Sequence, residues 1–372
     1  MKIIYTHDIF AFQRFGGISR YIVEIMKRIP PEVAEAKIFA GFHINEYLGG
    51  LQGVTGVKVP IFKGRGRVPL VLNALMYLGR RKVNDLAQRT FIHTGRDTVV
   101  HLSYYSSSMV RGGGKVVVTA YDMIHELFPQ YFPMDKATRT LKEASFKRAD
   151  RIIAISECTK RDLIRLFGVD PEKVTVIYLG NSLGHIAADE QAHTIGIPYI
   201  LYVGDRTGYK NFEGLTEAYA RSPLLRDSFA LVNFGGGAFT PWEKKRLMDM
   251  GISGLVHHVA GDDALLAAYY RNARAFIHPS LYEGFGLPLL EAMGFDCPVI
   301  CANAGSLPEV AGDAGVYFDP ENIEEIQHVL ETSLFDDTLL REQIKRGKKR
   351  VTEFNWDRAA RETMDLYRSL VG

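Results

Sequence analysis

The chain has 372 residues, 47% of them hydrophobic and 35 of them glycine, which predicts two domains of about 150–200 residues. Its 45 lysine and arginine residues almost balance 43 aspartate and glutamate residues, so the overall charge gives no reason to expect nucleic acid as a partner. The sequence shows neither the apolar core of a signal peptide nor the roughly 20 apolar residues of a membrane span, so we expect a cytoplasmic protein.

Short apolar or β-branched runs recur through the first half of the chain and alternate with stretches of helical spacing. They read KIIYT, AKIFAG, TVVHLS, KVVVTAYD, RIIAIS and KVTVIYLG. Strands of a parallel sheet are buried on both faces and are therefore almost continuously apolar, as VVVTA and RIIAIS are. The pattern predicts a doubly wound α/β domain over residues 1–182.

Residues 63–89 combine seven lysine and arginine residues with one opposing acid, Asp85, around an apolar middle. The segment is too short and too interrupted to span a membrane, but it suits an amphipathic helix in a lipid interface. An amphipathic helix packed on its own sheet explains the pattern equally well.

A second alternating series follows a polar, glycine-containing stretch at residues 183–197, which we interpret as a linker. The series reads IPYILYVG, SFALVNFGGG, VHHVAG, AFIHPS, PVICAN and AGVYFD. It predicts a second doubly wound domain over residues 198–353, and the two domains are expected to face a cleft.

The last segment, residues 354–372, has the apolar spacing of a single helix. Trp356, Ala360, Met364 and Tyr367 are separated by four, four and three residues and form one stripe.

The stretch SLYEGFGLPLLEAMG holds the strongest candidate site. Pro288 suits the first turn of a helix, and Gly284 and Gly286 allow backbone amides to approach a ligand closely. Free amides and the helix dipole favour phosphate at such a terminus, and Glu283 and Glu291 would flank it. Sugar hydroxyls are suitable partners for two carboxylates beside a phosphate, so a sugar nucleotide fits this pattern. Taken alone, Glu291 is explained equally well as an acid that stabilises the start of the helix.

These residues carry a resemblance to a known family. HPSLYEGFGLPLLEAMGFDCPVICANAGSLPEVAGDAGVYFDP resembles the signature of family 4 glycosyltransferases, retaining enzymes with the GT-B fold of two Rossmann-like domains. Further similarity lies in RFGGISRYIVEI, RADRIIAISECTKRDLI, YVGDRTGYKNFEGL and FNWDRAARETMDLYRSL, so the resemblance covers most of the chain. It implies that residues 354–372 cross back to the first domain.

The resemblance implies that residues 1–182 bind the acceptor and residues 198–353 bind the nucleotide sugar. It also implies roles for residues of the second domain. Glu283 should contact hydroxyls of the donor sugar and Glu291 the ribose, while Arg206 and Lys210 hold the diphosphate. Arginine offers a planar fork and lysine a mobile point charge, which agrees with that role. The amides around three further residues should meet the diphosphate: Phe285, Gly286 and Leu287. His278 is expected to pack against the residues of the site without contacting the ligand itself.

In the first domain, Gly16 and Gly17 resemble the glycine loop that lets the donor phosphate or the acceptor approach. Asp122 matches the family pattern, but Tyr121 stands where many relatives carry a histidine that touches the donor sugar. Tyrosine can donate a hydrogen bond but is no cation near neutral pH, so its role here differs. Three other sets of residues are weaker candidates for the cleft or the acceptor side: His125, His101, and Tyr104 or Tyr105.

No metal or other cofactor is expected. The acidic pair at residues 261–263 is interpreted as a helix cap, and the three cysteines show no metal-binding spacing. Cys158, Cys297 and Cys301 are interpreted as buried small hydrophobic residues. Charge on the leaving group would instead be met by Arg206, Lys210 and a helix terminus. The family implies front-face substitution in which the departing phosphate helps to deprotonate the acceptor.

The sequence thus predicts a retaining, metal-independent transferase that moves a hexose from a GDP- or UDP-sugar to a glycan acceptor. Mannose is the favoured sugar, and the favoured acceptor is a lipid-linked oligosaccharide of bacterial surface polysaccharide (O-antigen or capsule) at the inner face of the cytoplasmic membrane. Two alternatives stay open: a nucleotide-sugar epimerase of the same fold, and a non-catalytic relative that binds nucleotide or glycan.

Overall fold

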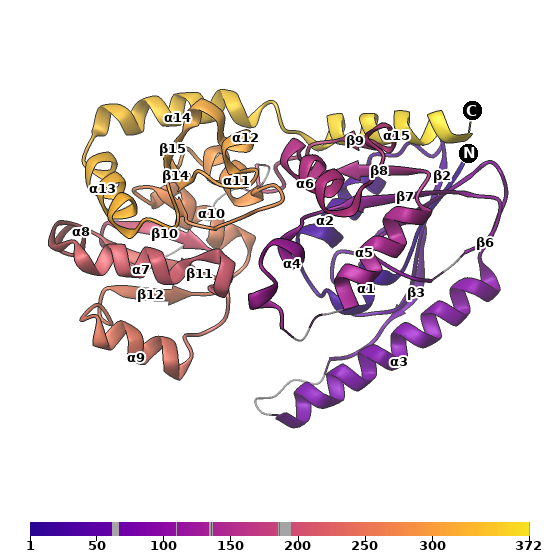
Figure 1. Ribbon diagram of the computed structural model, residues 1–372, viewed down its shortest axis with the longest axis horizontal. Helices are drawn as coiled ribbons and strands as arrows, with labels where there is room; N and C mark the ends of the chain where they lie inside the picture. Colours follow the sequence, from indigo (N-terminus) through magenta and orange to yellow (C-terminus); the bar gives the residue numbers. More distant parts are fainter. Residues whose placement is uncertain are drawn as a thin grey trace. The chain divides into compact units, whose positions relative to one another are not determined.

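The computed structural model describes residues 1–61, 67–108, 110–133, 135, 137–184, 186 and 195–371. Two compact units divide the chain (Figure 1). The first unit comprises residues 1–126, 132–179 and 356–372, and the second comprises residues 127–131 and 180–355. Most of the stretch 183–197 that we interpret as a linker lies outside the described residues, as do residues 63–66 of the basic segment.

The first unit is built on a parallel sheet of seven strands in the order β3-β2-β1-β5-β7-β8-β9. Its strands are β1 (Lys2–Tyr5), β2 (Glu35–His43), β3 (Val54–Lys58), β5 (Thr98–Leu102), β7 (Lys115–Ala120), β8 (Arg151–Ala154) and β9 (Val174–Val176). A separate pair is formed by β4 (His93–Thr94) and β6 (Arg111–Gly112). Every residue of β5 is buried, as expected for a central parallel strand covered on both faces.

The helices of the first unit are α1 (Asp8–Phe12), α2 (Gly17–Lys27), α3 (Arg67–Phe91), α4 (Ile124–Leu127), α5 (Ala137–Arg148), α6 (Glu157–Phe167) and α15 (Trp356–Val371). The last of these packs against α2 and β5, and the predicted stripe on it is buried. Tyr367 on this helix donates or accepts hydrogen bonds with His101 Nδ1 (2.5 Å) and Tyr5 Oη (3.2 Å) in the core.

The second unit has a parallel sheet of six strands in the order β12-β11-β10-β13-β14-β15. Its strands are β10 (Tyr199–Val203), β11 (Ala230–Phe234), β12 (Val256–Val259), β13 (Phe276–His278), β14 (Val299–Ala302) and β15 (Gly315–Phe318). Its helices are α7 (Phe212–Arg221), α8 (Pro223–Ser228), α9 (Pro241–Asp249), α10 (Asp263–Asn272), α11 (Leu287–Gly294), α12 (Leu307–Ala311), α13 (Ile323–Leu334) and α14 (Asp337–Val351).

Both sheets reverse their strand order, and open α/β sheets bind ligands outside the carboxyl ends of strands at such a point. In the second unit the reversal lies between β10 and β13, so the loops after these two strands meet there. In the first unit it lies between β1 and β5. The strand order alone therefore singles out one candidate site in each unit.

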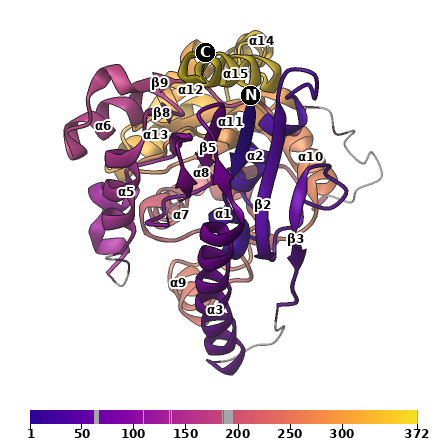
Figure 2. The same cartoon turned by 90° about the vertical axis from the view of Figure 1, so that its right-hand side faces the viewer.

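The long helix α3 turns its polar side inward. Asn84 pairs with the backbone of Phe42 through its side-chain amide (2.8 and 3.1 Å), and Gln88 is buried. The opposite side carries exposed Leu75 (60%) and Leu86 (67%). Figures 1 and 2 show α3 along the outside of the first unit. Helix α3 therefore packs against β2 of its own sheet, as one of the two interpretations expects, but among the described residues this contact is made by polar side chains.

Candidate active site

Glu283 lies at the strand-order reversal of the second unit, in the loop between β13 and α11. One carboxylate oxygen, Oε1, accepts from Lys210 Nζ (2.6 Å), Ser280 Oγ (2.7 Å) and His278 Nε2 (3.1 Å). Its second oxygen, Oε2, has no hydrogen bond from any protein group that the structure describes. One half of the carboxylate is therefore fixed by the protein, and the other half is open to a ligand hydroxyl.

The backbone of Glu283 is held as firmly as its side chain. The Glu283 carbonyl accepts from Ser306 Oγ (2.9 Å) and Ser306 N (3.2 Å). Gly305 has a φ of 57°, and a Cβ there would lie 2.9 Å from the nitrogen and oxygen of Glu283. Because only glycine tolerates this approach, residue 305 is part of the support of the site.

Lys210 and Glu283 form an ion pair whose side chains are 22% and 12% exposed. Burial raises the pKa of the Glu283 carboxyl, but the charge of Lys210 and the hydrogen bonds from His278 and Lys210 lower it far below its ordinary value of 4.5. Burial lowers the pKa of Lys210, and the charge of Glu283 raises it above its ordinary value of 10.5. Both groups are consequently charged at neutral pH.

Arg206 follows β10 and is buried, with 8% of its surface exposed. Its Nε donates to Glu243 Oε1 (2.6 Å), and Nη1 donates to Asn233 Oδ1 (2.5 Å) and the Gly237 carbonyl (3.0 Å). Nη2 donates to Glu243 Oε2 (3.3 Å) and the Ala238 carbonyl (3.4 Å). The fork that the resemblance assigns to a diphosphate is here occupied by protein acceptors and holds the glycine loop after β11.

Helix α11 begins as the sequence predicts. Gly286 is its N-cap with a φ of 99°, Leu287 is its first residue, and Pro288 lies in its first turn. The first amides of a helix have no acceptor within the helix, so the N–H groups of Gly286 and Leu287 lie at a terminus of the kind that binds anions. Glu291 lies one turn further on and accepts a hydrogen bond from Tyr270 Oη (3.1 Å). In the same unit, Asp262 caps α10 by accepting from Leu265 N (3.0 Å), as predicted for the acidic pair.

The candidate residues of the first unit differ in their surroundings: some lie at a helix terminus and others are buried. Gly16 is the N-cap of α2 and Gly17 its first residue, so the glycine loop lies at a helix N-terminus. Tyr121 is buried, and its hydroxyl donates to the Ser103 carbonyl (3.2 Å) inside the unit. Burial also raises the pKa of Tyr121 well above the ordinary value for tyrosine.

Asp122 is hydrogen-bonded to the buried ammonium group of Lys142. Lys142 has no exposed surface, and its Nζ donates to the Asp122 carbonyl (2.8 Å), to Glu126 Oε2 (2.8 Å) and to Asp122 Oδ1 (3.4 Å). His125 contacts Asp135 Oδ2 (3.2 Å). His101, expected on the acceptor side, is instead fully buried in the core, and burial lowers its pKa to about 3. That expectation for His101 is wrong.

Comparisons with known proteins identify the family of the chain. Residues 15–183 match the model of Glycosyltransferase Family 4, and residues 188–350 match that of Glycosyl transferases group 1. The chain belongs to glycosyltransferase family 4. The transferase is 29% identical to O-antigen chain mannosyltransferase B of Escherichia coli, an alignment that covers 100% of both chains.

Two further matches define how far the similarity goes. The transferase is 28% identical to the serotype-specific mannosyltransferase WbdA of E. coli over 69% of its own length, but it covers 34% of that protein. The solved structure of sucrose-phosphate synthase from Thermosynechococcus elongatus matches it with a TM-score of 0.75 at 19% identity, over 99% and 98% of the two chains. The likeness to this structure confirms the predicted GT-B fold.

Sequence reasoning missed several groups that hold the candidate residues of the transferase. Ser280 precedes Glu283 by three residues, a spacing that could have suggested the contact. Glu243 belongs to a capping box with Thr240, which explains its position in sequence but not its pairing with Arg206. Lys142 lies on α5, and no local signal connects it to Asp122.

Proposed function

We propose that this transferase moves a mannosyl residue from a nucleotide diphosphate sugar, with GDP-mannose favoured, to a glycan acceptor of bacterial surface polysaccharide. The observation that carries the proposal is the 29% identity over the full length of both chains to an O-antigen chain mannosyltransferase. A lipid-linked oligosaccharide is the acceptor we favour. We propose a cytoplasmic location for the reaction, with configuration at the anomeric carbon retained and no metal ion required.

The arrangement around Glu283 suggests how donor binding would begin. Lys210 neutralises Glu283 through one carboxylate oxygen. We propose that a donor-sugar hydroxyl donates to Oε2, while Lys210 turns toward the diphosphate, whose charge is larger. The amides at the start of α11 would complete the phosphate site. The cation and the helix terminus together would stabilise charge on the departing diphosphate, which is the work that a metal ion does in other transferases.

The other candidates receive different roles in this proposal. Arg206 would act mainly by holding residues 235–238 in place, because its N–H groups already bind protein oxygen atoms. Glu291 would bind the ribose, and Gly16 and Gly17 would let the donor or acceptor approach α2. Asp122, held in place by Lys142, would face the reacting sugar. Tyr121 would pack beside Asp122 and support its position. Retention would follow from front-face substitution, with the leaving phosphate taking the acceptor proton.

We also propose that α3 binds an anionic membrane surface. No helix among the described residues is long and apolar enough to cross a bilayer. The outward side of α3 combines exposed leucine and valine side chains with exposed Lys82 and Arg89. An amphipathic helix with this composition lies flat in a lipid interface, where cations meet anionic headgroups and apolar side chains enter the acyl region.

The binding half of the proposal is tested by thermal unfolding with GDP, UDP, GDP-mannose and UDP-glucose, each with and without EDTA. A ligand that binds only the folded protein raises the melting temperature. We expect GDP and GDP-mannose to stabilise the protein equally with and without EDTA. Stabilisation that EDTA abolishes would contradict metal independence, and no response to any nucleotide would contradict the transferase site.

A further inference from the structure

A short segment from the first half of the chain is part of the second unit. Residues 127–131 belong to the second unit, although the chain on either side of them belongs to the first. The segment contains the end of α4 and a 3₁₀ turn, Pro129–Tyr131, in which the Tyr131 amide donates to the Phe128 carbonyl (3.1 Å). No motif in the sequence indicated that this segment belongs to the second unit.

The two loops that carry Lys210 and Glu283 are joined to each other by two hydrogen bonds. Lys210 Nζ donates to Glu283 Oε1 (2.6 Å), and the Tyr209 carbonyl accepts from Leu281 N (2.8 Å). Gly208 begins the turn that carries Lys210, with a φ of 46°. Because glycine is the most flexible residue, the local sequence fixes the direction of this turn only weakly. The turn therefore needs support from elsewhere in the fold.

Aromatic side chains of the segment contact both loops. A Cβ on Gly208 would lie 2.5 Å from Cδ1 of the Tyr131 ring, so the ring lies closer to the turn than a residue with a side chain would allow. Phe128 contacts Tyr282 of the other loop, with ring centroids 6.4 Å apart. The rings of Phe128 and Tyr131 are nearly parallel, with centroids 6.3 Å apart. One rigid aromatic pair thus supports both loops.

Tyr131 is not a core residue. Its surface is 42% exposed. Replacing a side chain as exposed as this one is expected to change the global stability only slightly. The contact between its ring and the turn at Gly208 is therefore the feature that gives this position a role.

We propose that Tyr131 is a positioning residue of the donor site, which holds the turn at Gly208 so that the Lys210 ammonium meets the β-phosphate of the nucleotide sugar. The inference rests on the proposed function, because it takes Lys210 as the cation that binds the diphosphate. Lys210 lies beside Glu283, which is assigned to the donor sugar, and the β-phosphate is the one bonded to that sugar. The ring acts through the turn and does not touch the ligand.

A preorganised cation binds more tightly because less freedom is lost when the ligand arrives. Removing the ring should therefore weaken the contact with the β-phosphate and leave the contacts with the rest of the nucleotide unchanged. A general loss of folding would instead weaken every part of the nucleotide site equally.

The first test measures binding of GDP and GMP to the full chain by titration calorimetry, because these nucleotides differ only in the β-phosphate. UDP and UMP replace them if the parent prefers uracil. We expect Tyr131→Ala to weaken GDP binding about tenfold and GMP binding by no more than about twofold. Tyr131→Phe keeps the ring and should bind both nucleotides as the parent does. In transfer assays, Tyr131→Ala should raise the donor KM about tenfold and leave the acceptor KM unchanged.

Two double variants show whether the ring acts through the turn. Lys210→Met lacks the ammonium group, so adding Tyr131→Ala to it should change the remaining GDP affinity by no more than about twofold. Gly208→Ala places a Cβ against the ring and should lower the melting temperature. Adding Tyr131→Ala to Gly208→Ala should recover part of that loss, and the rest comes from the φ of 46°, which alanine adopts poorly.

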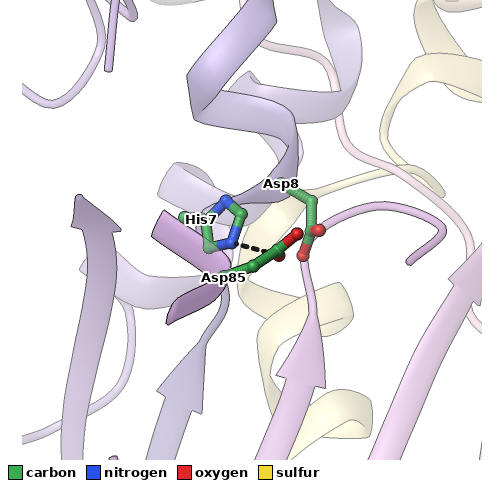
Figure 3. A group of neighbouring side chains, drawn as sticks. All are labelled: His7, Asp8 and Asp85. Atoms are coloured by element: carbon green, nitrogen blue, oxygen red, sulfur yellow. Dashed lines mark hydrogen bonds and ion pairs between the residues drawn. The ribbon is translucent and has the colours of Figure 1, made fainter. Parts of the chain in front are cut away.

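Two controls separate this role from a loss of stability. Phe335→Ala removes a ring of similar exposure (44%) from the second unit. Asp85→Ala removes the hydrogen-bond partner of the buried His7 Nε2 in the first unit (3.1 Å), a bond that Figure 3 shows beside Asp8. Because a buried polar group is then left without its partner, Asp85→Ala should lower the melting temperature. Neither control should change the ratio of GDP to GMP affinity.

The outcomes distinguish failure of this inference from failure of the proposed function. If the parent binds GDP, but Tyr131→Ala leaves the ratio of GDP to GMP affinity at the parent value, the positioning role is overturned and the transferase proposal stands. If Gly208→Ala lowers the melting temperature equally with and without the Tyr131 ring, the ring does not support the turn and the inference is also overturned. If the parent binds no nucleotide, the proposed function is overturned and the role of Tyr131 falls with it.

Discussion

Replacing Lys210 with methionine removes the ammonium group of the central ion pair and keeps most of the side-chain volume. The Glu283 carboxylate then retains Ser280 and His278 as partners but loses its counter-charge. Removing one member of a buried pair costs about 3–5 kcal/mol, and the residual exposure of 22% and 12% reduces this to about 2 kcal/mol. For a domain of this size we expect a melting temperature lower by roughly 4–8 °C.

The pH dependence of this loss follows from the lowered pKa of Glu283. A carboxyl group whose pKa is lowered by folding stabilises the native state above its ordinary value of 4.5, and that contribution disappears as the pH falls toward the lowered pKa. Lys210→Met removes the main cause of the lowering. The difference in stability between parent and variant should therefore be largest near pH 7 and should shrink below pH 4.5.

A double-mutant cycle with Glu283→Gln tests the pairing itself. Glutamine is neutral, so the double variant has no uncompensated charge, and we expect it to recover at least half of the stability lost in Lys210→Met. Transfer activity should stay low in all three variants. Urea and thermal unfolding measure the stabilities, and release of GDP measures activity. If the two single losses simply add, the ion pair does not contribute as described.

Three other changes test separate features. Arg206→Lys cannot reproduce the fork to Glu243, so we expect donor KM to rise more than tenfold with a lower melting temperature; an unchanged KM would show that the fork is dispensable. Gly286→Ala forces a φ of 99° on a residue with a Cβ and should cost about 1–3 kcal/mol, measured by urea unfolding. Leu86→Asp on α3 should reduce binding to vesicles containing anionic lipid, measured by flotation, while transfer to a water-soluble acceptor stays at the parent rate. Undiminished flotation would exclude α3 as the lipid contact.

The strands were the most predictable part of the fold, because continuously apolar runs arise from burial on both faces of a parallel sheet. All twelve predicted strand segments contain a strand in the structure. The edge strand β3 (Val54–Lys58) was not predicted, since three glycine or polar residues in VTGVK and its high exposure give it no apolar signature. The domain boundaries at residues 182, 197 and 353 stay predictions.

The candidate site was predictable in its members but not in its pairings. Local motifs marked Glu283 and Lys210, yet 73 residues separate them, and only the strand order brings their loops together. The same limit applies to Arg206 and Glu243. The basic pattern of α3 indicated an amphipathic helix, but it could not say that Asn84 and Gln88 face inward. That orientation depends on backbone groups of β2 that need a partner.

The most direct test of the central claim is transfer itself, measured with radiolabelled GDP-mannose and a mannose-terminated acceptor, with Glu283→Gln as the control. We predict label in the lengthened glycan, GDP release that depends on the acceptor, and a loss of at least a hundredfold in the control. Conversion of the donor sugar without an acceptor would identify an epimerase. Nucleotide binding without turnover, or full activity in Glu283→Gln, would contradict the account given above.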